Sequence, residues 1–238
     1  MTASRSNSSI KKQARDLLLG LYRKYYEESG TYLHPDDFFP VDIQKIISSV
    51  MKWKLEIVSD IGCDNYGQNL RGHCNYDEKR IRISTEGINP GEKVFTVAHE
   101  IGHAILHKNA CCIAPGSARK RAIRRVDKIM TSDKERRMER EANLFAAEIL
   151  MPEKAVRDHF IKIFGRKELW IGSMKAQKIS ADFIKKSKNT GKIPKNAKDF
   201  SPFFAEYKEK KSNPSLREFF GVSSAAISRR LLDLGLLY

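Results

Sequence analysis

One short stretch near the middle of the chain decides how the rest is interpreted: residues 97–107 read VAHEIGHAILH. His99 and His103 are four residues apart, so on a helix they lie on one face, one turn apart. Two imidazoles placed in this way can bind one zinc ion at about 2.0–2.1 Å. Glu100 follows the first histidine, where a carboxylate can reach a metal-bound water and act as the general base of a zinc peptidase. A helix that only carries two surface histidines would show the same spacing, so a third ligand has to be found.

A second helix, predicted over 133–150 and closed by Pro152, offers that third ligand. Its apolar residues recur at intervals of three and four and trace a buried stripe. Glu139 stands at the edge of this stripe, one turn before Asn143. A carboxylate there needs a neutralising partner, because an unpaired buried charge is very costly, and Zn²⁺ would supply one. Asn143 could then hydrogen-bond a metal ligand, while Glu141 is a rival for the position of third ligand.

The two helices together carry a family pattern. Residues 95–104 read FTVAHEIGHA, and residues 139–152 read EREANLFAAEILMP. In these motifs the chain resembles the ImmA/IrrE family of metallopeptidases. The resemblance covers residues 45–155 and extends more loosely to the C-terminal end. The pairing of both motifs is far more specific than the HExxH pattern alone.

The resemblance implies a gluzincin-like site in which His99, His103 and Glu139 bind the metal and Glu100 is the base. Glu139 is preferred over Glu141 because its spacing matches the family's ExxxN pattern. The implied cofactor is one Zn²⁺ per chain, with another divalent metal such as Mn²⁺ as an alternative. The implied partner is a protein substrate, a transcriptional repressor of the helix-turn-helix type that is cut at one or a few sites.

Two further histidines lie near this pattern. His107 is two turns from His99 on the same face, which is too far for both to bind one metal, so we interpret it as a partly buried or supporting histidine. His73 lies in a predicted hairpin, where it could line the cleft and stabilise an oxyanion. An ordinary strand histidine is the favoured interpretation.

The predicted fold class is α+β, with a small antiparallel sheet packed beside the active-site helix. Residues 54–59 are rich in β-formers, and residues 70–75 and 80–84 flank a turn, as in a hairpin. The charged connection 108–134 follows the active-site helix and has a helical pattern over 118–130. The predicted parts of the chain are a disordered tail (1–9), an N-terminal helical segment (10–44), a metallopeptidase core (45–155) and a basic C-terminal helical region (156–238).

Composition narrows the class of protein. The chain has 238 residues, 41% of them hydrophobic and 31% charged, which is typical of a folded domain. No uninterrupted apolar run approaches the roughly 18 residues of a membrane span, and the polar N-terminus does not resemble a secretory signal. We therefore expect a cytoplasmic protein with no membrane partner. Its cysteines (Cys63, Cys74, Cys111 and Cys112) lack CxxC spacing, which favours free thiols over a cysteine zinc site.

The positive charge is concentrated toward the C-terminal end. Residues 153–238 hold 19 Lys and Arg against 9 Asp and Glu, whereas the whole chain has a net charge of +15. Within this region, 214–237 reads as a helix-turn-helix-like pair with Ser223 as N-cap of the second helix. Its base-facing candidates in a DNA complex would be Ser224, Ser228 and Arg229. A structural or substrate-docking role for this pair is favoured over DNA contact.

Two functions from different classes follow. The first is a zinc endopeptidase that makes limited, site-specific cuts in a protein. The alternative is a DNA-binding transcriptional regulator with a structural or sensory metal site. Glu100 favours the peptidase, because a structural site needs no base and normally fills its fourth position with a protein ligand.

Overall fold

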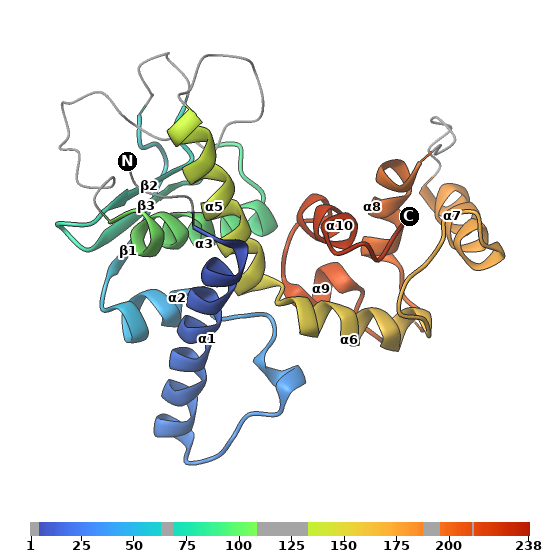
Figure 1. Cartoon of the computed structure of the whole chain (residues 1–238), viewed down its shortest axis with the longest axis horizontal. Coiled ribbons are helices and arrows are strands. Elements are labelled where there is room, and N and C mark those ends of the chain that lie inside the picture. The colour runs from blue at the N-terminus through green and yellow to red at the C-terminus, as the bar shows by residue number, and fades with distance from the viewer. Residues whose placement is uncertain (1–4, 63–68, 109–132, 188–195, 211) are drawn as a thin grey trace. The chain divides into compact units, whose positions relative to one another are not determined.

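The computed structural model describes residues 5–62, 69–108, 133–187, 196–210 and 212–238, which belong to two compact units, Met1–Leu150 and Met151–Tyr238 (Figure 1). The mixture of helices with one small sheet confirms the α+β class. The elements of the first unit are α1 (Asn7–Ser29), η1 (Pro35–Phe38), α2 (Ile43–Lys45), η2 (Ile46–Met51), β1 (Lys54–Val58), β2 (Gly72–Asn75), β3 (Arg80–Ser84), α3 (Pro90–Leu106) and α5 (Asp133–Leu150).

The sheet has three strands in the order β1-β3-β2. The predicted hairpin is present, since β2 and β3 are antiparallel with His73 opposite Arg82. The expectation of a wholly antiparallel sheet needs one correction, because β1 pairs with β3 in parallel, Leu55 opposite Ile81. The reason is topological. β2 runs in the opposite direction to β1 and is not its neighbour, so one strand position lies between them. β3, reversed again by the hairpin turn, fills that position parallel to β1.

The active-site helix α3 begins where local sequence predicts a helix start. The side chain of Asn89 accepts a hydrogen bond from the Glu92 backbone N–H at 2.9 Å, and Pro90 occupies the first turn. Ten of its residues, from Thr96 to Leu106, are buried. The helix therefore lies within the unit, packed against β2, β3 and α5.

The crossing of α3 and α5 is close because Gly102 has no side chain. A Cβ at Gly102 would lie 3.1 Å from both Cα and the carbonyl oxygen of Ala142. On α5 the predicted apolar stripe is buried, including Met138, Ala142 and Phe145. This contact brings the first half of α5 alongside the two histidines of α3.

The N-terminal helix belongs to the same unit as the site. It packs against α5 and buries Ile10, Ala14 and Leu21. The helix begins earlier than predicted, at Asn7, because the side chain of Ser6 caps it by accepting from the Ser9 backbone N–H. The prediction of a disordered tail over 1–9 is therefore wrong for residues 7–9.

The second unit is helical and contains α6 (Glu153–Phe164), α7 (Met174–Ser187), α8 (Ala197–Glu206), α9 (Leu216–Phe220) and α10 (Ser224–Asp233). Its core is aromatic, with Phe160, Phe164, Phe204 and Phe220 fully buried. The predicted helix-turn-helix-like pair corresponds to α9 and α10, joined at Gly221 in the left-handed conformation. The unit begins at Met151, five residues before the predicted boundary.

Several predictions fall on residues that the structure does not describe. These are the cysteines Cys63, Cys111 and Cys112 and the helical pattern over 118–130. Among the described residues, Cys74 is buried. Within the same residues, no helix has both the length and the apolar character needed to cross a membrane.

Candidate metal centre

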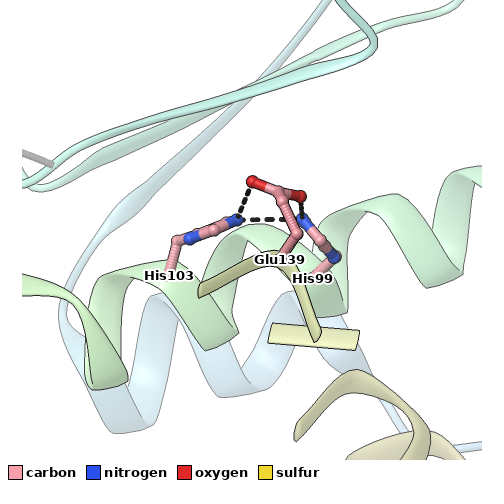
Figure 2. Close-up of side chains that lie close together, drawn as sticks. All are labelled: His99, His103 and Glu139. Carbon is pink, nitrogen blue, oxygen red and sulfur yellow. Dashed lines mark hydrogen bonds and ion pairs between the residues drawn. The ribbon is translucent and has the colours of Figure 1, made fainter. Parts of the chain in front are cut away.

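Three side chains from two helices converge on one point (Figure 2). His99 and His103 of α3 approach to 2.9 Å between their Nε2 atoms. Glu139 of α5 places its two carboxylate oxygens 3.2 Å from His99 Nε2 and 3.3 Å from His103 Nε2. A tetrahedral zinc ion with bonds of about 2.0–2.1 Å separates its ligand atoms by roughly 3.3 Å. The spacing of these donors therefore fits a zinc ion that binds the two imidazoles and the carboxylate.

The electrostatics of the cluster also fit a cation. Two Nε2 lone pairs that face each other repel unless a proton or a metal lies between them. Burial lowers the pKa of His99, but the hydrogen bond and charge of Glu139, with the charge of Glu100, outweigh it and raise the pKa above its usual value. Burial lowers the pKa of His103 to about 4. Burial raises the pKa of Glu139, but the hydrogen bonds of both histidines outweigh this effect and leave it well below its usual value.

The ring nitrogen of His99 that faces away from the cluster, Nδ1, is hydrogen-bonded to Asn143, as the sequence suggested. His99 Nδ1–H donates to Asn143 Oδ1 at 3.0 Å. This bond places the proton on Nδ1 and leaves the Nε2 lone pair facing the cluster. Because Glu139 and Asn143 are one turn apart on α5, the same helix supplies one donor atom and orients another.

Glu141, the rival third ligand, lies elsewhere. Its Oε2 is 3.0 Å from Nε2 of His107, and His107 Nδ1 is 3.0 Å from Nδ1 of His103. Both His107 and Glu141 are buried. Hence Glu139 joins the two histidines, and Glu141 contacts the cluster only through His107.

The side chain of Glu100, which belongs to α3, lies against β2. It is only 3% exposed. A Cβ added to Gly72 would come within 2.5 Å of Glu100 Oε1, so β2 leaves just enough room for this carboxylate. Sequence reasoning missed Gly72, although a glycine inside a predicted strand can signal such a close approach.

His73 does not share this position. Successive strand residues point to opposite faces of a sheet, and the Gly72 face of β2 contacts Glu100. His73 therefore lies on the face away from Glu100, which rules out the suggested oxyanion role and leaves an ordinary strand histidine.

The base-facing candidates of the C-terminal pair are engaged within the second unit. Ser228 is buried, Ser224 hydrogen-bonds Glu206, and Arg229 pairs with Asp233 at 2.8 Å. A buried serine cannot read a base edge, so Ser228 drops out of the suggested set of three, whereas Arg229 remains exposed.

The part of the chain that contains the cluster is similar to a known peptidase family. Residues 64–171 match the model of the Peptidase M78 family, described as the IrrE N-terminal-like domain. This match confirms the resemblance indicated by the two helical motifs, and it contains both histidines and Glu139. Over 96 residues the chain is 30% identical to "Uncharacterized immunity region protein 2" of Bacillus phage phi105. That alignment covers 40% of this chain and 53% of the phage protein, so the chain spans about half the length of this relative.

Proposed function

We propose, starting from the Peptidase M78 match of residues 64–171, that this chain is a zinc-dependent endopeptidase. The observation that supports this most directly is the convergence of His99, His103 and Glu139 with Glu100 one residue after the first histidine. Three protein donors leave a zinc ion one open position, which is typical of catalytic rather than structural sites.

The roles of the four residues follow from their positions. His99, His103 and Glu139 would hold the metal. When bound there, zinc supplies a Lewis acid that polarises the scissile carbonyl and makes water more acidic. Mn²⁺ or another divalent metal is the alternative occupant.

Glu100 would move the proton. Its carboxylate belongs to the same helix as the two histidines but is packed against β2 at Gly72. From there it would accept a proton from the attacking water and deliver it to the leaving amine nitrogen. The C–O bond to the attacking water forms first, the C–N bond breaks when the nitrogen receives the proton, and no other reactant is required.

The proposed substrate is a transcriptional repressor of the helix-turn-helix type, cut at one or a few positions in the cytoplasm. Two observations support it: the resemblance to the ImmA/IrrE family in the HExxH and ExxxN motifs, and the phage relative, whose name refers to an immunity region. The alternative, a DNA-binding regulator with a structural metal, has less support. Of the three side chains that were candidates for reading DNA, Ser228 is buried, whereas Arg229 is exposed and pairs with Asp233 on its own helix.

The decisive experiment compares new protein N-termini in host cells that express the wild type or Glu100→Gln. One or a few cuts that depend on Glu100 would establish the peptidase and identify its substrate. Identical N-termini in both strains, at rest and under stress, would contradict the proposal. DNA binding by the full chain would then be measured.

A further inference from the structure

A chain of buried polar side chains leads away from His103 on the side opposite the candidate metal position. His107, the first residue beyond α3, lies 3.0 Å from His103 through their Nδ1 atoms. Its other ring nitrogen, Nε2, lies 3.0 Å from Oε2 of Glu141 on α5. His107 is 6% exposed and Glu141 8% exposed, so water competes little for these contacts.

The proton positions on His103, His107 and Glu141 follow from one requirement. If Nε2 of His103 binds a metal, its proton must be on Nδ1. His107 Nδ1 must then accept that proton, so His107 carries its own proton on Nε2. That Nε2–H points at a carboxylate oxygen of Glu141, which can only accept.

The opposite tautomer of His107 is unfavourable at both ends. A proton on His107 Nδ1 would face the proton on His103 Nδ1. The lone pair on His107 Nε2 would then face the carboxylate of Glu141. Only one arrangement of protons therefore satisfies all three side chains together.

Glu141 is itself held in place. Arg137, one turn earlier on α5, brings Nε to 3.8 Å from Glu141 Oε1. Arg5, which precedes α1, brings a guanidinium nitrogen to 3.9 Å from Glu141 Oε2. Two positive charges from different segments compensate for the burial of this carboxylate.

We propose that His107 and Glu141 are positioning residues for the metal. They fix His103 in the Nδ1–H form and its ring in the orientation that presents Nε2 to the metal. The inference deepens the proposed function and rests on it. The two ligand histidines are thus oriented differently, His99 by the amide oxygen of Asn143 and His103 through a second histidine backed by a carboxylate.

The test uses the full chain and Zn²⁺, with affinity measured by competition against a chromophoric chelator. His107→Leu fills the space but cannot accept the proton, and we expect zinc to bind roughly 10–100-fold more weakly, as is typical for loss of such a partner. In His107→Gln, the side-chain oxygen can accept from His103 and the NH₂ can donate to Glu141. This variant should therefore recover most of the affinity. Glu141→Leu should resemble His107→Leu, whereas Glu141→Gln keeps an acceptor and should bind zinc more tightly than Glu141→Leu.

A matched control separates positioning from general destabilisation. His159 is also a buried histidine, stacked on Phe219 in the second unit. His159→Leu should leave zinc affinity unchanged. Equal losses in His159→Leu and His107→Leu would overturn the proposal.

A spectroscopic measurement tests the proton positions directly. In zinc-loaded protein labelled with ¹⁵N-histidine, His107 should be the Nε2–H tautomer, and the Nδ1–H of His103 should exchange slowly with solvent. His107→Leu should accelerate that exchange. An Nδ1–H tautomer of His107, or zinc affinity unchanged in His107→Leu, would overturn the positioning role of His107 and Glu141 while leaving the proposed peptidase function intact.

The outcomes also separate this inference from the proposed function. If the wild type binds zinc and His107 has the expected tautomer, but the protein cleaves no substrate, the proposed function fails and the positioning role stands. Failure of the wild type to bind zinc would overturn both.

Discussion

Gly72 and Glu100 are in such close contact that a single added methyl group would collide with the carboxylate. A Cβ at Gly72 would lie 2.5 Å from Glu100 Oε1 and 2.9 Å from its Cγ. Residue 72 opens an edge strand, β2, and residue 100 lies in the middle of the active-site helix. The sheet thus sets the position of the proposed general base, although the histidines and Glu139 that would bind the metal come from helices.

Gly72→Ala should impair turnover while sparing metal binding. The new Cβ would displace the Glu100 carboxylate, and a displacement of about 1 Å can reduce a rate by roughly 10²-fold. We expect kcat to fall by about that factor with zinc affinity nearly unchanged, as measured with the identified substrate and by chelator competition. His73→Ala, on the other face of the same strand, is the control and should keep its activity. Full activity in Gly72→Ala would show that the carboxylate works from another position.

Substitutions of the two central glutamates should separate chemistry from metal binding. Glu100→Gln should retain zinc and lose about 10²–10⁴-fold in turnover, because the amide cannot accept the proton. Glu139→Ala should lose both zinc and activity, as measured by metal content after dialysis. Glu135→Ala, one turn earlier on α5, serves as the control. Tight zinc binding by Glu139→Ala would argue against Glu139 as a ligand.

Zinc affinity should depend on pH with a defined sign. The raised pKa of His99 means that a proton occupies Nε2 below that pKa and must leave before the metal binds. Affinity should therefore rise by about tenfold per pH unit below the His99 pKa and level off above it. His103, with a pKa of about 4, is neutral there and adds no dependence. Chelator competition between about pH 6 and pH 8 checks this, and a flat profile would contradict it.

Gly102→Ala should weaken both the fold and the site. Its Cβ would lie 3.1 Å from backbone atoms of Ala142, which cannot move without shifting α5. We expect a loss of about 1–3 kcal/mol in the free energy of unfolding, the usual range for overpacking, together with weaker zinc binding. Chemical denaturation of the metal-free chain measures the first effect.

Gly20→Ala is the matched control, another helical glycine whose added Cβ would meet the end of the Val50 side chain. Val50 is only partly buried and the contact involves its side chain rather than backbone atoms, so this neighbour can shift and the effect should be smaller than that of Gly102→Ala. Equal destabilisation by the two substitutions would show that the α3–α5 crossing has no special sensitivity.

Part of the site could be predicted because it depends on spacing within one helix. His99 and His103 share a face for this reason, and the same four-residue step links Glu139 to Asn143. The start of α3 followed from Asn89 and Pro90 in the same local way. The choice between Glu139 and Glu141 did not follow from spacing, since both acids lie on one helix. The preference for Glu139 came from family resemblance.

The sequence by itself therefore determined the helices, the hairpin and the pairs of residues one turn apart, because hydrogen bonds and side-chain periodicity within one segment set them. Only the tertiary structure decided which groups from different segments meet. It made β1 parallel to β3, packed Gly72 on Glu100, and directed Glu141 to His107. These contacts depend on how far α3 and α5 approach and how each is rotated about its axis. The backbone contact between Gly102 and Ala142 fixes that geometry, and no local pattern encodes it.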